Sequence, residues 1–439
     1  TRAGMTVALF ATHFTVMGAK VGLPCCLAML TSQSTGLTFS SSKGTPQEQF
    51  ARILGLSTMA IAGGKLVLGP LIDRVGGIFS LRVALAFLTT MLGCIALGQH
   101  ISVFAICWIL VDFIFSACWA GCLNAVHQSF PEEDWSTKVG ILAVAARSGN
   151  CLAFLIFGTL LSSQMAQDIK QPWRLVFWVS AAMQLVPLTL LTYFGNRISE
   201  NNNGDAIKTV AMSDSESEKY GNDKAHTLQS ILSPMKVLRS EIGKLEFWQH
   251  LISRACLMVF SCILLFVPTL MNGVYGMNSA DAARTGAVFA GGCMLSLSLS
   301  SNHYGKLTRL QKASTLASLL GLSTCCALTQ WAHMVGRITL SASASVLSMF
   351  LWGFGFAIPF YIPPSLYALK RGGRVSSATI ADCFDFVGFS CVAVFNRYMA
   401  LIDHSIQTAW SLPFLILAGC SLLSMITLIP ATLFPSEGS

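Results

Sequence analysis

Charged residues are scarce in this chain. Asp, Glu, Lys and Arg make up 11% of its 439 residues, whereas hydrophobic residues make up 53%, and the mean hydropathy is +0.62. A soluble globular domain carries about 25% charged residues, so this composition excludes an ordinary soluble protein. It is typical of a polytopic membrane protein, whose outer surface faces lipid.

Motifs that carry chemistry are also absent from the sequence. It has no Cys/His cluster with zinc spacing, no Walker loop and no nucleophile elbow, so we expect no metal, no cofactor, no ATP-driven transport and no enzyme activity. The 15 cysteines fall mostly in apolar runs and are interpreted as packing residues. The net charge of +8 is spread over loops, without a basic helix, so no nucleic-acid partner is expected.

Long apolar runs occupy most of the chain. A membrane-spanning helix needs about 20 mostly apolar residues, which leaves room for about twelve helices. The predicted spans are residues 5–30, 50–70, 79–98, 102–128, 138–162, 172–194, 247–271, 282–300, 312–331, 338–363, 375–400 and 408–433. We therefore expect an N-terminal six-helix half in residues 1–195 and a C-terminal six-helix half in residues 247–439.

One long polar segment, residues 196–246, separates these halves. Its runs Asn201–Gly204 and Ser213–Lys219 cannot bury apolar surface and predict a disordered cytosolic linker. Residues 233–245 are expected to form a surface helix at its end. The chain begins at Thr1 without Met, and an upstream segment, such as a targeting peptide, is left open.

Basic residues concentrate in loops of one parity. These residues are Arg74, Arg82, Lys138, Lys306, Arg309, Lys312, Lys370, Arg371 and Arg374, together with those of the central segment. The positive-inside rule then predicts a multi-pass protein in a lipid bilayer, with both termini and the central loop on the cytosolic side. The host membrane stays open.

A glycine-rich turn joins the second and third predicted spans, where residues 63–77 read GGKLVLGPLIDRVGG. Glycine permits close backbone approach, and an Asp-Arg pair can change partners as helices slide. The pattern Gly69-x-Leu-x-Asp73-Arg74-x-Gly76 resembles the loop between helices 2 and 3 of the major facilitator superfamily. The resemblance implies an all-α fold of twelve transmembrane helices in two six-helix halves, with these four residues as a conformational latch.

A narrower resemblance starts at Lys65. A lysine at this spacing before the glycine and the Asp-Arg pair is similar to the organophosphate:phosphate antiporter branch of that superfamily. Residues 119–140, Asn150 and the pair Trp173-Arg174 also resemble that branch, and Lys20 occupies a place similar to its basic residue in helix 1. The nitrate/nitrite porter branch is a competing relative, since its helix 5 carries a Gly-Asn pair comparable with residues 149–150.

Ionisable residues inside predicted spans are functional candidates, because a charge in hydrocarbon is tolerated only beside a partner or a cavity. They are Lys20, Lys65, Asp112, Arg147, Arg254, Asp382 and Asp385. Counting along the helices places Lys65 and Arg147 near the midplane, where such transporters bind substrate. We expect substrate contacts from Lys20, Lys65, Arg147 and Asn150, because an anion needs several positive donors to replace its water.

Three acids are expected to supply coupling or counter-charge. Asp382 and Asp385 lie three residues apart on one helix face. They either carry coupling protons, pair with Arg147 or Lys65 across the cavity, or simply neutralise buried cations and fix the packing of the halves. Asp112 is either a coupling site or a partner for nearby polar groups. Arg254 is expected to snorkel or to act in gating. The aromatic run Trp352–Tyr361 is interpreted as a gate or as packing.

These observations favour secondary active transport of a small organic or inorganic anion, phosphate-like or organophosphate-like, by exchange or with proton coupling. One alternative is a proton-coupled carrier of a neutral or zwitterionic solute. Another, from a different class, is a non-transporting receptor or structural subunit of a larger membrane assembly.

Overall fold

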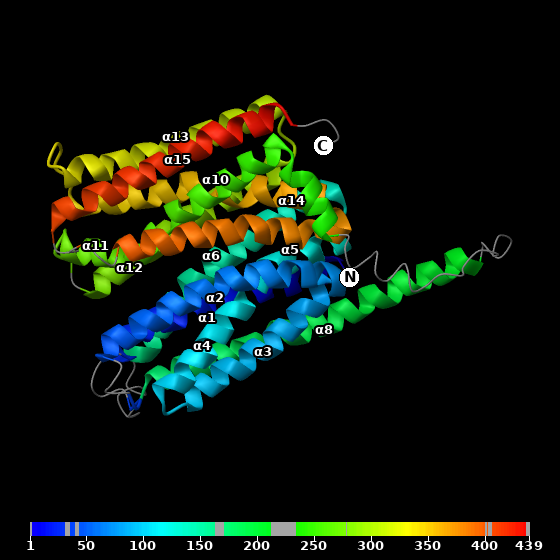
Figure 1. The fold of residues 1–439 in the computed structure, drawn as a ribbon, viewed down its shortest axis with the longest axis horizontal. Helices are drawn as coiled ribbons and strands as arrows, with labels where there is room; N and C mark the ends of the chain where they lie inside the picture. The colour runs from blue at the N-terminus through cyan, green and yellow to red at the C-terminus, as the bar shows by residue number, and fades with distance from the viewer. Residues whose placement is uncertain are drawn as a thin grey trace.

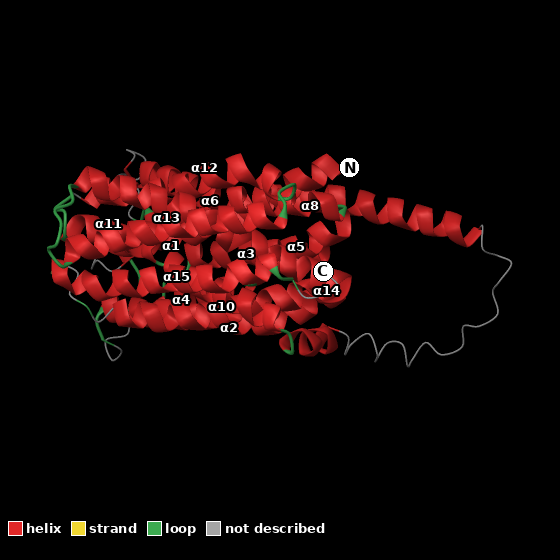
Figure 2. Cartoon of the chain, turned by 90° about the horizontal axis from the view of Figure 1, so that it is seen from above, coloured by secondary structure: helices red, strands yellow, loops and turns green. Residues whose placement is uncertain are grey.

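The computed structural model describes residues 2–30, 36–39, 44–162, 171–211, 234–277, 279–399, 402 and 406–435. Within these ranges the chain is helical, apart from turns and one isolated bridge between Thr38 and His100. The helices run side by side as one elongated bundle (Figures 1 and 2). The chain thus forms an all-α protein, as the sequence predicts.

The first half of the chain forms one side of the bundle (Figure 1). Its helices are α1 (Arg2–Leu30), α2 (Pro46–Val75), α3 (Gly77–Leu97), α4 (Ile101–Phe115), α5 (Ala117–Ser129), α6 (Glu132–Ser162) and α8 (Trp173–Ala211). The second half forms the other side. Its helices are α10 (Leu245–Ser261), α11 (Ile263–Gly273), α12 (Ser279–Tyr304), α13 (Arg309–Met334), α14 (Ala342–Met399), η2 (Gln407–Trp410) and α15 (Ser411–Leu433).

The predicted spans can be compared with these helices. Among the described residues, nine helical stretches are long and apolar enough to cross a membrane, from Arg2–Cys26 to Gln407–Leu433. The other three predicted spans are also helical and coincide with α10 plus α11, α12 and α13. These helices lie in the same bundle, but they are interrupted or carry more polar residues, which lowers their hydropathy.

The element α14 contains two predicted spans in one continuous helical stretch. Gly373 has φ 54° and ψ −150°, a conformation open to glycine, and it separates Ala342–Gly373 from Val375–Met399. The backbone N–H groups that follow this break open a new helix and have no partner within it. They are therefore available to an acceptor from elsewhere in the fold.

The central segment differs in part from the disorder that the sequence predicts. Residues 212–233 lie outside the described residues, and the run Ser213–Lys219 with them. The helix α8 continues to Ala211, because extending an existing helix avoids the cost of nucleation. Residues 234–242 are also helical, and Glu241 accepts a hydrogen bond of 2.6 Å from the Tyr367 hydroxyl.

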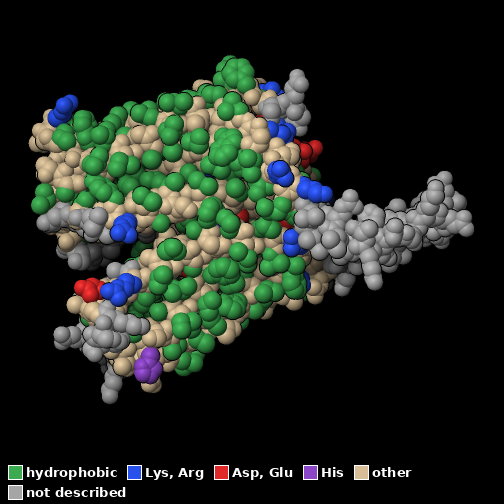
Figure 3. All heavy atoms as spheres, in the orientation of Figure 1, with side chains coloured by type: hydrophobic (Ala, Val, Ile, Leu, Met, Phe, Trp, Pro, Cys, Tyr) green, Lys and Arg blue, Asp and Glu red, His purple; other side chains and the backbone are tan. Residues whose placement is uncertain are grey.

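The surface of the bundle matches a protein set in lipid. Exposed apolar side chains cover its flank, among them Leu66 and Val67 on α2 and Ile106 on α4, all more than half exposed. Figure 3 shows hydrophobic side chains spread over the long sides, while the Lys and Arg side chains gather at the two ends. Such a band is expected of helices that face hydrocarbon between two aqueous interfaces.

Glycine permits a close helix contact in the first half. A Cβ atom added to Gly149 of α6 would lie 2.2 Å from the carbonyl oxygen of Phe14 on α1. Small residues at such crossings drive helix association in lipid, where the hydrophobic effect between helices is absent. Gly158, two turns further along α6, has open space at the same position.

We predict that Gly149→Ala destabilises the protein by about 1–3 kcal/mol, because the added methyl group forces α1 and α6 apart. Gly158→Ala on the same helix is the matched control and should be neutral or slightly stabilising. Thermal unfolding of the purified variants in detergent measures both. Equal melting temperatures for the two variants would contradict the close-contact interpretation.

Candidate functional site

The two halves meet mainly along two helix pairs. α2 packs against α14, and α6 packs against α12, with further contacts of α14 to α5 and α6. On the face drawn in Figure 3, a groove separates the halves at the end opposite the chain termini. Most of the predicted site residues lie on these helices, so the interface between the halves is the candidate site.

A buried network of four charges crosses this interface. The Lys65 ammonium on α2 lies 2.8 Å from Asp382 Oδ1 and 3.0 Å from Asp385 Oδ2, both on α14. Arg254 on α10 completes the network, since its Nε donates to Asp385 Oδ1 at 2.8 Å. Two cations face two carboxylates, so the network is neutral as a whole.

The two carboxylates of the network differ in their surroundings. Asp385 uses both oxygens, one for Lys65 and one for Arg254. Asp382 uses Oδ1 alone, and its buried Oδ2 has no hydrogen-bond partner among the described residues. Asp382 is therefore the acid of the pair with an oxygen free to hold a proton.

Close approach of α2 to α14 makes this network possible. A Cβ atom added to Gly69 would lie 3.0 Å from Asp382 Cβ and 3.2 Å from the carbonyl oxygen of Ala378. Any larger side chain at Gly69 would push α14 away and lengthen the contact between Lys65 and Asp382. The glycine of the sequence motif thus positions the charges one turn away from it.

Lys20 and Asp112 form a separate ion pair inside the first half. Asp112 lies on α4 and is almost fully buried, and the Lys20 ammonium also lies over the rings of Trp108 and Phe115, at 5.2 and 4.9 Å from their centroids. The structure therefore gives Lys20 a carboxylate partner within its own half.

Arg147 on α6 is placed differently from both lysines. Its side chain is 6% exposed, yet it forms no ion pair with any carboxylate in the described part of the chain. Its guanidinium lies over two rings of α14, at 5.5 Å from the Tyr361 centroid and 5.9 Å from the Phe356 centroid. Its Nε has no hydrogen-bond partner among the described residues. Arg147 is thus a buried positive charge without a compensating negative one.

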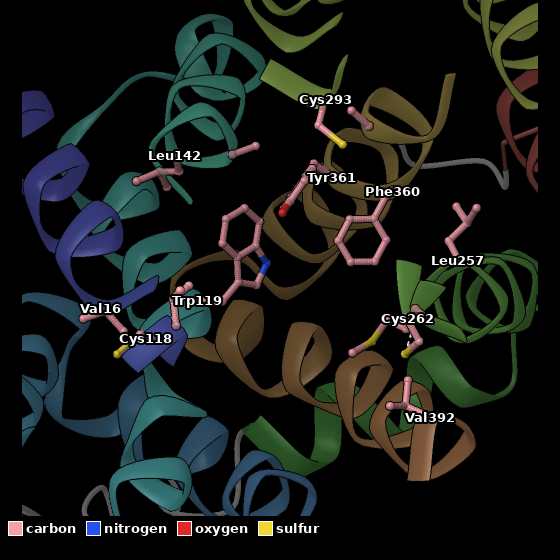
Figure 4. Packing of buried hydrophobic residues seen from close by; sticks show 14 of the residues in the cluster. Val16, Cys118, Trp119, Leu142, Leu257, Cys262, Cys293, Phe360, Tyr361 and Val392 are labelled. Carbon is pink, nitrogen blue, oxygen red and sulfur yellow. Dashed lines mark hydrogen bonds between the residues drawn. The ribbon is translucent and has the colours of Figure 1, made fainter. Parts of the chain in front are cut away.

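Further aromatic side chains adjoin the rings that contact Arg147. Trp119 of α5 lies 5.6 Å from Tyr361 and 5.1 Å from His13 of α1, measured between ring centroids. The Trp119 indole and the Tyr361 hydroxyl point toward one another in Figure 4. His13 was missed in the sequence analysis, although the rule that selects ionisable residues in spans includes histidine.

The predicted latch lies at the other end of the interface from the groove. Asp73 accepts hydrogen bonds from the backbone N–H groups of Ala378 and Thr379, at 3.0 and 2.7 Å, and from the Thr379 hydroxyl at 2.7 Å. Asn124 donates a fourth hydrogen bond of 3.0 Å. A carboxylate from the first half therefore caps the helix that begins after Gly373 in the second half.

The remaining predicted residues lie near these groups. Gly76 has φ 91° and ends α2, and Arg74 beside it is exposed. Asn150 is half-buried on α6, about one turn from Arg147. Among the described residues, no group of three or more His, Cys, Asp or Glu side chains is arranged to hold a metal ion.

Comparison with known proteins places this geometry in a family. A family model described as Major Facilitator Superfamily matches residues 5–381. The chain belongs to the major facilitator superfamily. This membership confirms the predicted fold class and identifies a transporter fold that is not an enzyme. The narrower likeness to the organophosphate:phosphate antiporter branch stays a prediction.

Solved structures of major facilitator proteins are similar to this chain. The proton:xylose symporter XylE bound to 6-bromo-6-deoxy-D-glucose gives a TM-score of 0.72 at 13% identity, over 97% of this chain and 94% of XylE. The xylose transporter XylE from E. coli, partially occluded and inward open, gives 0.68 at 14% identity, over 100% of this chain and 99% of XylE. FucP in the outward conformation gives a TM-score of 0.64 at 12% sequence identity, over 96% of this chain and 98% of FucP. No curated protein matches. At these identities the likeness shows the fold alone.

We predict that Lys65→Met destabilises the protein by about 3–5 kcal/mol, because it leaves two buried carboxylates facing Arg254 alone. The double variant Lys65→Met/Asp382→Asn should recover most of this loss, since the remaining pair is balanced. Lys65→Met/Asp112→Asn is the matched control and should not recover. Thermal unfolding in detergent measures all three, and recovery in the control would contradict the network.

We predict that Asp73→Asn slows conformational cycling and leaves ligand binding intact. The N–H groups of Ala378 and Thr379 donate to different oxygens of Asp73, and the Asn amide keeps only one oxygen that can accept. The control is Glu132→Gln, which breaks the exposed pair with Lys370 between the same halves and should have little effect. Transport rates in proteoliposomes measure conformational cycling, and ligand-induced thermal shifts measure ligand binding. Unchanged transport in Asp73→Asn would refute the latch.

Proposed function

We propose that this protein is a secondary active transporter of a small anion, with Arg147 as the main binding group. The observation that carries the proposal is the buried guanidinium that lacks a carboxylate partner among the described residues. A desolvated charge is costly unless it is compensated, and an anionic substrate supplies that compensation when it binds. Arg147 also lies between the halves, where its environment changes as they move.

The other buried cations support this choice of binding group. Lys65 and Arg254 are neutralised by Asp382 and Asp385, and Lys20 is neutralised by Asp112. Binding of an anion by these residues requires that an existing ion pair first opens. We therefore propose counter-charge roles for Asp112 and Asp385, and secondary roles for Lys20, Lys65 and Asn150 during the transport cycle.

Alternating access is the proposed mechanism. The Asp73 cap holds the halves together at the end of the bundle where both termini lie, and the groove lies at the opposite end (Figures 1 and 3). Breaking the Asp73 and Lys65 contacts frees α14 from α2, so the halves can rock about the central site. By the charge bias of the loops, we propose that the closed end faces the cytosol.

A proton-coupled carrier of a neutral or zwitterionic solute is the second candidate. The observation that favours it is the free Oδ2 oxygen of Asp382 inside the charge network. Protonation there would weaken the contact with Lys65 and release α14 from α2. In the anion transporter that we favour, the same step would couple proton movement to anion transport.

The proposed function predicts that Arg147→Gln lowers anion uptake by about 10- to 100-fold, because a hydrogen bond to a charged group contributes about 1.5–3 kcal/mol. Arg147→Lys keeps the charge and should retain partial uptake. Arg337→Gln is the matched control, since Arg337 also lies over an aromatic ring, that of Trp331 at 5.3 Å, but is exposed. Uptake of labelled anions into proteoliposomes preloaded with the same anion measures these rates.

The same vesicles separate the alternatives. Proton-driven uptake of a neutral solute that survives Arg147→Gln and is lost in Asp382→Asn would favour the second candidate. Absence of uptake for every anion and neutral solute, in a protein that purifies with fixed partners, would favour a non-transporting subunit.

A further inference from the structure

The surroundings of Arg147 restrict the kind of anion that fits. Two rings, Phe356 and Tyr361, lie against its guanidinium, and ring-to-ring contacts extend them into a continuous group of five. We call these side chains the aromatic set: His13, Trp119, Phe356, Phe360 and Tyr361. The Phe360 ring also lies 3.8 Å from the Arg254 guanidinium. Phe360 lies 4.7 Å from both Phe356 and Tyr361, measured between ring centroids. All five are buried. The Arg147 guanidinium therefore lies against two ring faces, and no second cation lies over those rings among the described residues.

The aromatic set is divided between the two halves. His13 and Trp119 belong to α1 and α5, whereas the other three belong to α14. The contact between Trp119 and Tyr361 therefore lies across the interface (Figure 4). When the halves separate, this ring–ring contact and the contact of Arg147 with Tyr361 are both broken. A ligand that enters between them must replace one aromatic face and one cation–ring contact.

The charge that this site can neutralise is small. Arg147 alone provides an uncompensated positive charge there, because the other buried cations among the described residues of the interface are paired with carboxylates. A phosphate dianion needs several cationic donors to replace its water, whereas one guanidinium matches one carboxylate in a two-point contact. The unused donor at Arg147 Nε and the unused ring nitrogen at His13 Nδ1 supply the remaining polar contacts.

We propose that the substrate is a planar organic monocarboxylate whose carboxylate binds Arg147 and whose flat ring or conjugated chain lies between Trp119 and Tyr361. The proposal rests on the proposed function and names the substrate class of the same site. The two rings are in contact in this structure, with their planes tilted by 56°, so the ligand would enter as the halves separate and the rings turn toward it. Stacking on aromatic faces favours a planar ligand over a saturated ring of equal size and charge. Trp119 and Tyr361 are then specificity-determining residues, and Arg147 is the charge-binding residue.

The experiment compares three probes with the purified full chain. Benzoate is planar, cyclohexanecarboxylate has the same charge and a similar size but a saturated ring, and inorganic phosphate carries more charge. We expect benzoate to bind about tenfold more tightly than cyclohexanecarboxylate. Phosphate should bind more weakly than both. Ligand-induced thermal stabilisation, titrated for each probe, gives the three dissociation constants.

Variants then assign the preference to the aromatic set. In Trp119→Leu, the dissociation constants of benzoate and cyclohexanecarboxylate should differ by no more than about twofold. Binding of both should still be weakened by Arg147→Gln. Tyr361→Phe keeps the ring and should keep the preference. The matched control is Trp178→Leu on α8, where the indole is 46% exposed on the outer surface. It should leave all three dissociation constants unchanged.

The outcomes distinguish the proposed substrate class from the proposed function, anion transport, on which it rests. Phosphate binding more tightly than benzoate, and lost in Arg147→Gln, would overturn the planar monocarboxylate and leave the anion transporter standing. An equal preference for benzoate in Trp119→Leu and Trp178→Leu would also overturn it. If no probe binds in a way that depends on Arg147, the proposed function fails together with this inference.

Discussion

The pairing of buried charges between α2 and α14 is the interaction on which the rest of the structure depends. Lys65 can lie inside the bilayer only because Asp382 and Asp385 meet it at hydrogen-bond distance. That meeting requires the close helix approach that Gly69 permits. The same approach brings Asp73 to Ala378, near the start of the helix Val375–Met399, so the charge network and the Asp73 hydrogen bonds both join the two halves.

Arg147 is the exception to this pairing, and we propose that it is the group that binds the substrate. The other buried cations described here, Lys65 and Arg254, and the partly buried Lys20 are each paired with a carboxylate of the protein. In the function that we propose, an anion would compensate this charge of Arg147 when it binds at the interface. Arg147 belongs to the first half and the two rings that it contacts, Phe356 and Tyr361, belong to the second, so movement of the halves changes these contacts.

Predictions from the sequence succeeded where a structural property depends on residues that are close together in the chain. Apolar runs long enough to span a bilayer identified the helices, and the turn from Gly69 to Gly76 identified the family, because both depend on residues close together in the chain. The same reasoning selected Lys65, Arg147, Asp382 and Asp385. It offered Lys65 and Arg147 as alternative partners of these acids and could not choose between them, since residues far apart in the chain meet only through tertiary packing.

The sequence by itself determined that the chain lies in a membrane, that it forms two sets of helices and that its interior contains charges. Solvation requires this, because hydrocarbon accepts helices and rejects isolated ions. The tertiary structure alone decided which charges cancel. It paired Lys20 and Lys65 with carboxylates and placed Arg147 against aromatic rings, in a group that includes His13. The way the helices cross sets these distances, and no local spacing in the sequence encodes them.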